Sequence, residues 1–147
     1  MDAIDHAILG AVVADGRMTL HQLAERVHLG PSATRERLRR LERTVIRGYA
    51  ANPDPVVLGF PIDALIDVDL PGGADTVAFE AVLRDTPQVV EALHATGEHD
   101  YLLRLRCTHT DELHTTVRRL KAQHGALRTR TSVVLDHTLP SRQRLPD

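Results

Sequence analysis

The spacing of apolar residues changes near Pro53-Asp54-Pro55, and this change constrains the fold more than any other feature of the 147-residue chain. Before these prolines, apolar residues recur every three or four positions, as on the buried side of a helix. After them, residues 62–70 alternate with a period of two, which is typical of a strand with one apolar face. Prolines interrupt pairing and favour an extended chain. We therefore expect domains over residues 1–52 and 61–147, joined by a linker over residues 53–60.

Capping residues and apolar spacing predict short helices in the first half of the chain. Asp2 can cap the first helix, and Thr19, with Gln22 three residues later, has the pattern of a capping box. Gly30 ends the next turn, and Pro31 restarts a helix because its missing N–H needs no partner at the first helical position. The helices are expected over residues 3–14, 20–27 and 31–42, followed by a short strand over residues 46–52.

The last of these helices lies in a basic segment. Residues 32–48 contain six arginines and two glutamates, a balance of +4, whereas the chain from Pro53 onward has ten basic and fourteen acidic residues, a balance of −4. Such a segment fits either an anionic partner, such as nucleic acid, or a solvated helix face. A short helix and a tight turn precede this basic helix. Together, these features predict a (winged) helix-turn-helix domain whose second helix enters the major groove of double-stranded DNA.

Helical spacing separates the buried residues of this helix from those expected to meet DNA. Thr34, Leu38 and Leu41 share one face, so the polar side chains point outward. Outward residues near the helix start can reach base edges, whereas arginines further along meet phosphates. We predict base contacts from Ser32, Arg35 and Glu36, and backbone contacts from Arg39, Arg40 and Arg43. Glu36 could equally pair with an arginine of its own helix, and Arg37 could be structural.

The second half of the chain predicts the element order βαββαβ. Asp75 can cap one helix, which ends at Arg84, and Thr110 begins another, which ends at His124-Gly125. Strands are expected over residues 62–70, 89–96, 101–107 and 127–135. This order is that of a ferredoxin-like fold, in which both helices cover one face of an antiparallel sheet. The chain is therefore expected to be an α+β protein.

The other face of this sheet is expected to stay open to a partner. If the strands follow the usual topology, Asp67 and Asp69 would lie beside Arg104 and Arg106 on that face. Paired charges of this kind would make burial against a second subunit tolerable.

Several segments together resemble the Lrp/AsnC family of regulators, also called feast/famine regulators. In the first half they are Asp2-Ala-Ile-Asp5, Ile8-Leu9, Asp15-Gly-Arg17, Leu23-Ala24, Val27-His-Leu29, Arg37-Leu38-Arg-Arg-Leu41-Glu42 and Ile46-Arg-Gly48-Tyr49. In the second half they are Thr96-Gly97-Glu98-His99-Asp100-Tyr101-Leu102-Leu103 and Thr129-Arg130-Thr131. The segment Glu42-Arg-Thr-Val45-Ile46 departs from the pattern, because members usually carry one more residue, a glycine, before the Val-Ile pair.

The resemblance implies a transcription regulator whose second domain dimerises sheet to sheet, assembles into an octamer and binds an amino acid beside the glycine-containing turn. The effector contacts that it implies are Thr96, Gly97, Glu98, His99, Asp100, Tyr101, Thr129 and Thr131. A turn containing Gly97 can expose backbone N–H groups to a carboxylate, while Glu98 or Asp100 can meet an ammonium group. The position of His99 varies in the family, so His99 could tune the choice of effector. The alternative interpretation is that this segment is a plain hairpin turn.

Other classes of function have little support in the sequence. The chain has no glycine-rich phosphate loop and no Gly-x-Ser-x-Gly elbow, so no enzyme and no catalytic residue is predicted. The nine histidines match no standard zinc spacing, so no metal and no cofactor are expected. The single Cys107 lies in an apolar alternating stretch and is expected to be a buried, unreactive thiol.

Location and the remaining alternative follow from the same sequence. No apolar run approaches the roughly 20 residues that span a bilayer, so a cytoplasmic protein without a membrane partner is expected. An oligomeric small-molecule sensor with weak or vestigial DNA binding is the second candidate function.

Overall fold

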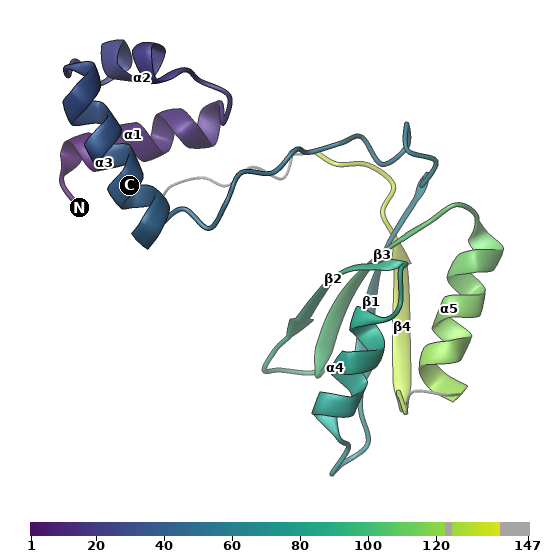
Figure 1. Cartoon of the computed structure of the whole chain (residues 1–147). Helices are drawn as coiled ribbons and strands as arrows, with labels where there is room; N and C mark the ends of the chain where they lie inside the picture. Colours follow the sequence, from purple (N-terminus) through teal and green to yellow (C-terminus); the bar gives the residue numbers. More distant parts are fainter. Residues whose placement is uncertain (123–124, 139–147) are drawn as a thin grey trace. The chain divides into compact units, whose positions relative to one another are not determined.

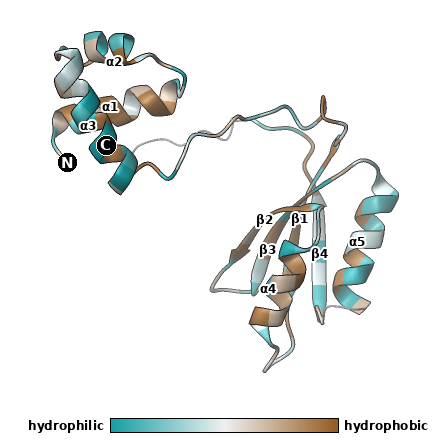
Figure 2. Cartoon of the chain, viewed as in Figure 1, coloured by the Kyte–Doolittle hydropathy of each residue, from teal (hydrophilic) through white to brown (hydrophobic). Residues whose placement is uncertain are grey.

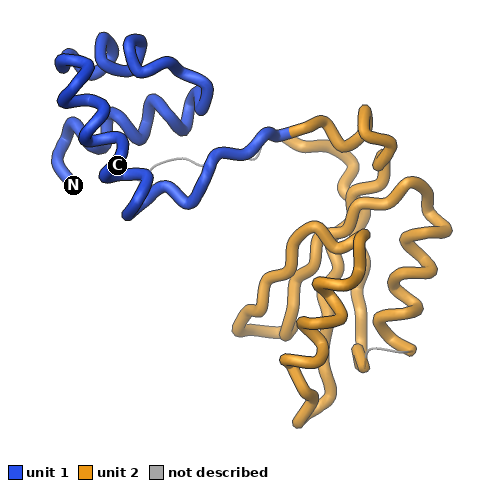
Figure 3. Tube along the Cα trace, in the orientation of Figure 1, with its two compact units in different colours: residues 1–52, 139–147 blue, residues 53–138 orange. Residues whose placement is uncertain are grey.

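The computed structural model describes residues 1–122 and 125–138, which form two compact units. The division falls between Asn52 and Pro53 (Figure 3). Unit 1 comprises residues 1–52, unit 2 comprises residues 53–138, and each has its own apolar core. Residues 123–124 and 139–147 of the predicted second domain, with the predicted helix end at His124, lie outside the described residues.

Unit 1 consists of helices α1 (Ala3–Ala14), α2 (Leu20–Arg26) and α3 (Pro31–Thr44) (Figure 1). The side chains of Asp2 and Asp5 each accept a hydrogen bond from the other residue's backbone N–H, and Thr19 and Gln22 form the same capping box. These bonds satisfy N–H groups that have no partner at a helix start. The three helices enclose a core of Ile8, Leu9, Ala11, Leu23, Val27 and Leu41.

The chain after α3 differs from the prediction. Helix α3 continues to Thr44, and the backbone N–H groups of Val45 and Ile46 both donate to the carbonyl of Leu41, at 2.8 Å each. Residues 46–52, all within the described part of the chain, form no strand, so the predicted strand is wrong. A strand needs a second strand to complete its hydrogen bonds, and the described residues of unit 1 supply none.

Unit 2 has the predicted α+β order and a four-stranded antiparallel sheet. Its elements are β1 (Ile62–Asp69), α4 (Thr76–Arg84), β2 (Val89–His94), β3 (Tyr101–Cys107), α5 (Thr110–Ala122) and β4 (Arg128–Val133). The strands lie in the order β2-β3-β1-β4, and α4 and α5 cover one face of the sheet (Figure 1). The fold class is confirmed: a helix-turn-helix unit is followed by a ferredoxin-like βαββαβ unit.

The core of unit 2 lies between the sheet and its two helices. Alternate residues of β1, namely Ala64, Ile66 and Val68, are fully buried. The facing strand β3 and the helices complete this core with Leu103, Leu105, Cys107, Phe79, Leu83, Leu113 and Leu120. Because side chains alternate along a strand, the intervening residues of β1 lie on the open face.

The open face has a different register from the one expected. Arg106 lies opposite Asp63 and Arg104 lies opposite Leu65, so neither arginine is beside Asp67 or Asp69. Strands β1 and β3 are antiparallel, so the end of β3 that carries both arginines meets the beginning of β1, whereas the two aspartates lie at the end of β1. The expected neighbours are therefore wrong, and Arg104 binds Asp63 instead, with its Nη2 2.6 Å from Asp63 Oδ2.

Replacing Leu103 by alanine tests this core. Leu103 is fully buried (0% exposed), so Leu103→Ala removes apolar contacts and leaves a cavity. We expect the free energy of unfolding of unit 2 to fall by about 2–5 kcal/mol, measured by urea unfolding. The control is Val77→Ala on α4, which is 73% exposed and should change stability by less than about 0.5 kcal/mol. Equal losses in the two variants would contradict the core described here.

Candidate DNA-binding and effector-binding surfaces

The outer face of α3 carries most of the residues predicted to meet DNA. Thr34 and Leu41 are buried at 0% and 1% exposure and direct the opposite side of the helix outward. The residues exposed on that side are Ser32, Arg35, Glu36, Arg39 and Arg43. At about 100° per residue these five side chains occupy less than a third of the helix circumference. Parts of α3 are correspondingly hydrophilic in Figure 2. The outer face of α3 is therefore suited to polar contacts with a DNA groove.

Two arginines of α3 are engaged within unit 1. Arg40 Nη2 lies 2.7 Å from each carboxylate oxygen of Asp5. Arg37 Nη1 donates to Asp2 Oδ2 at 2.6 Å and to Asp5 Oδ1 at 2.9 Å. Arg40, which the sequence predicts to contact the DNA backbone, is thus bound to a carboxylate of α1 in the structure. Sequence reasoning missed Asp2 and Asp5 as partners because 32 to 35 residues separate them from the arginines.

The predicted effector turn connects β2 to β3, and hydrogen bonds join it to the end of β1. Gly97 has φ +138°, a backbone conformation that favours glycine. The Asp100 N–H donates to the carbonyl of Val68 at 3.0 Å. Its carboxylate accepts a 2.7 Å hydrogen bond from the Leu70 N–H. Asp100 therefore already has a structural partner, and Glu98 is the exposed carboxylate of the turn.

His99 projects from this turn onto β1. Its Nδ1 lies 2.6 Å from Asp69 Oδ1, and its Nε2 lies 3.9 Å from Asp67 Oδ2. The hydrogen bond to Asp69 raises the pKa of His99, against the opposing effect of burial, and the charges of both aspartates act in the same direction. A protonated His99 thus neutralises part of the negative charge at this end of the open face.

The remaining predicted effector residues lie on the helix-covered face. Tyr101 and Thr129 flank Val68 in the sheet, and Thr131 lies beside Ile66. Tyr101 is only 2% exposed, and its hydroxyl donates to Glu80 Oε1 at 3.1 Å. The chain brings residues 96–100 together in the turn before Tyr101, whereas the side chains of His99 and of the two threonines lie on opposite faces of the sheet.

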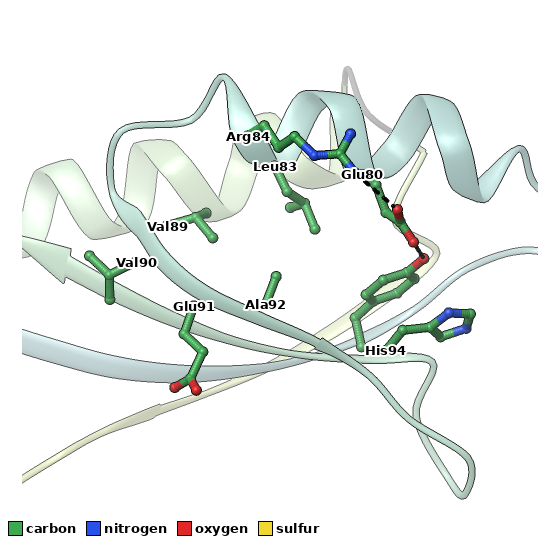
Figure 4. Close-up of a pocket in the computed structure, with 9 residues that line it drawn as sticks. Glu80, Leu83, Arg84, Val89, Val90, Glu91, Ala92 and His94 are labelled. Carbon is green, nitrogen blue, oxygen red and sulfur yellow. Dashed lines mark hydrogen bonds and ion pairs between the residues drawn. The ribbon is translucent and has the colours of Figure 1, made fainter. Parts of the chain in front are cut away.

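A pocket of about 390 Å³ opens between α4 and β2 (Figure 4). His94 stacks on Tyr101 with ring centroids 4.5 Å apart, and Arg84 pairs with Glu80 at 3.3 Å. Leu83, Val89, Val90, Glu91 and Ala92 complete the lining. Among the predicted effector contacts, Tyr101 lines this pocket. The four-residue spacing of Glu80 and Arg84 is typical of an ion pair on a helix, but this spacing does not predict the pocket.

The described residues give no metal site. No group of three or more histidine, cysteine, aspartate or glutamate side chains comes together among them. Burial, with a smaller contribution from the Glu112 charge, raises the pKa of Cys107 to about 11. Its thiol is therefore protonated at neutral pH, which disfavours nucleophilic chemistry. No helix within the described ranges is both long and apolar enough to cross a membrane.

Comparisons with known proteins identify both units. Residues 1–42 match the AsnC-type helix-turn-helix domain, and residues 63–144 match the Lrp/AsnC ligand binding domain. The chain is thus a transcriptional regulator with a helix-turn-helix DNA-binding domain followed by a ligand-binding domain. It belongs to the Lrp/AsnC family.

Individual relatives agree with this assignment along nearly the whole chain. The transcriptional regulator AldR of Mycobacterium tuberculosis is 33% identical over 141 residues, covering 93% of this chain and 79% of AldR. The leucine-responsive regulatory protein of Salmonella typhimurium is 34% identical over 148 residues, covering 96% and 88%. A Neisseria meningitidis transcriptional regulator in complex with L-methionine superimposes with a TM-score of 0.92 at 33% identity, covering 99% of this chain and 96% of that one.

The contact between His99 and Asp69 predicts a pH dependence. Since the pKa of His99 is raised in the folded state, the contact stabilises unit 2 fully below about pH 6.5 and is lost as the pH rises through the raised value. We expect the Tm advantage of the wild type over His99→Gln to be greatest below about pH 6.5 and to shrink as the pH rises above it. His114→Gln, at an exposed position on α5, is the control. A wild-type advantage that is constant with pH would contradict this contact.

Proposed function

We propose that this chain binds operator DNA through the outer face of α3 and that an amino acid bound by unit 2 modulates its DNA binding or assembly. The observation that carries the proposal is the division of α3 into two sides. Thr34 and Leu41 are buried, while Ser32, Arg35 and Arg39 are exposed together. In this proposal Ser32, Arg35 and Glu36 read base edges, and Arg39 and Arg43 bind phosphates. Because its target is chromosomal DNA, we place the action of the protein in the cytoplasm.

The proposed effector is an amino acid. The Neisseria meningitidis regulator and a feast or famine regulatory protein of Mycobacterium tuberculosis, which is 31% identical with a TM-score of 0.90, are both complexed with L-methionine. In this chain the exposed carboxylate of Glu98 suits an ammonium group, and the N–H groups around Gly97 suit a carboxylate. Since Thr129 and Thr131 lie on the other face from His99, we propose that contacts to one effector come from more than one copy of the chain.

The proposed assembly is a dimer through the open sheet face, followed by a higher oligomer, expected to be an octamer. Leu65 and Leu93 are 36% and 49% exposed on this face. Arg104 and Asp63 are already paired beside them, so burial against a second copy would not leave these two charges unpartnered. Exposed apolar residues beside a paired charge support a protein interface at this face.

Replacing Arg39 by glutamine tests the DNA contacts. The plot of log binding constant against log salt has a slope of about −0.9 per neutralised phosphate, so Arg39→Gln should make the slope shallower by about 0.9. Fluorescence anisotropy with a duplex selected from a random-sequence pool by the wild-type protein measures it. Arg118→Gln, on α5 of the other unit, should leave the slope unchanged. Absence of wild-type binding at low salt, with or without amino acids, would overturn the DNA-binding proposal and favour the sensor alternative.

A thermal-shift screen of the amino acids tests the effector proposal. A ligand that binds only the folded state raises its Tm, and Glu98→Gln should reduce that shift by removing the charge that meets the ammonium group. Gly97 is a poor position for this test, because its φ of +138° would strain any other residue. Asp111→Asn, an exposed carboxylate at the start of α5, is the matched control. An unchanged shift in Glu98→Gln would remove Glu98 from the site.

A further inference from the structure

A cluster of ion pairs lies between α1 and α3, on the opposite side of α3 from Arg35. Its centre is Asp5, which is 2% exposed although it is a charged residue. Both carboxylate oxygens of Asp5 contact Arg40 at 2.7 Å, and Oδ1 also accepts from Arg37 at 2.9 Å. A buried carboxylate requires such partners, because an unpaired charge is costly to bury.

The cluster also includes the cap of α1. Asp2 accepts from Arg37 at 2.6 Å and from the Asp5 N–H at 2.9 Å. Burial acts to raise the pKa of Asp5, but the Asp2 N–H, the Arg37 guanidinium and the charge of Arg40 outweigh it, so the pKa is lowered. Asp5 is thus held as an anion, and it binds two cations of the helix that faces DNA.

We propose that Asp5 is a positioning residue for DNA recognition, which holds the Arg37 and Arg40 guanidinium groups against α1 and keeps them from DNA phosphates. This inference rests on the proposed DNA contacts of α3. Of the six arginines in residues 32–48, two are then reserved for the orientation of α3. The outer face keeps Arg35, Arg39 and Arg43, whose positions relative to the groove depend on that orientation.

The arrangement favours discrimination between DNA sequences over electrostatic affinity for any DNA. Phosphate contacts add affinity for any sequence, whereas base contacts from a correctly oriented helix add affinity for the operator alone. Two arginines held by Asp5 contribute nothing to binding of unselected DNA, and they fix the orientation on which base contacts depend. Loss of the Asp5 charge should therefore raise binding to unselected DNA relative to binding to the operator.

The test is the salt dependence of DNA binding by the full chain carrying Asp5→Asn, which removes the charge at nearly constant volume. Two probes are used, the duplex selected by the wild-type protein and an unselected duplex of the same length. We expect the salt slope on the unselected duplex to steepen by about 0.9 for each released arginine, about 1.8 at most. The ratio of selected to unselected affinity should fall. In the double variant that carries both Asp5→Asn and Arg40→Gln, the salt slope should be shallower than in Asp5→Asn by about 0.9.

Control variants separate this role from a structural one. Glu25→Gln makes the same change in net charge at an exposed position, where its partner is His21, and should leave the slope unchanged. A merely destabilised unit 1 would bind both duplexes more weakly without a steeper slope, and that result would overturn the proposal.

The single variant Arg40→Gln gives an independent answer if Asp5→Asn does not fold. Arg40 is 52% exposed in its side chain, so the substitution is tolerable. An unchanged salt slope supports the proposal, whereas a slope shallower by about 0.9 would show that Arg40 meets a phosphate and would overturn it. Failure of the DNA-binding proposal itself is recognised separately, by a wild-type protein without salt-dependent binding.

Discussion

The pairing of β1 with both β3 and β4 holds unit 2 together. One side of β1 buries Ala64, Ile66 and Val68 against the two helices, and the other side carries the aspartates of the open face. Because the side-chain period of a strand is two, a slip of one residue would move carboxylates into the core and apolar side chains out of it. The alternation along β1 therefore determines which side of the strand faces the helices, and its pairing with β3 places the predicted effector turn beside the end of the strand.

Charge pairing on the open face reinforces this register. Burial acts to raise the pKa of Asp63, but the hydrogen bond and charge of Arg104 outweigh it and lower the pKa. At the other end of β1, Asp69 has His99 at 2.6 Å and Arg128 at 3.9 Å. Buried ion pairs add little net stability, since desolvation offsets their attraction, but breaking one leaves a costly charge. The pairs thus oppose incorrect registers more than they strengthen the correct one.

Features encoded by neighbouring residues could be predicted from the sequence, whereas contacts between distant residues could not. The caps at Asp2 and Thr19 and the alternation of β1 depend on side chains within a few positions, so the helix starts and the βαββαβ order followed directly. The partner of Arg104 depends on strand register, which the alternation alone does not specify, since shifts of two residues preserve it. The strand expected over residues 46–52 failed for the same reason, because a strand requires a partner that local sequence cannot supply.

The candidate sites also combine features encoded by neighbouring residues with contacts between distant ones. The outer face of α3 follows from helical periodicity, so the exposure of Ser32, Arg35 and Arg39 was predictable from spacing. The engagement of Arg40 by Asp5 was not, because it joins residues 35 positions apart. Charge counting treats all six arginines of residues 32–48 as equivalent. Only tertiary contacts distinguish Arg37 and Arg40, which bind carboxylates at the start of α1, from the arginines exposed on the outer face.

The separate cores of the two units limit how an effector could control DNA binding in the proposed function. Unit 1 has its own caps and its own buried cluster, so the residues that form its core lie within unit 1. A ligand can shift DNA affinity only through a difference in its affinity for two states of the protein. In the proposed function, that difference lies in how copies of the chain assemble. Linking helix-turn-helix domains through an oligomer multiplies affinity by roughly 10²–10⁴. A modest effector-dependent change in assembly would therefore suffice to regulate operator binding.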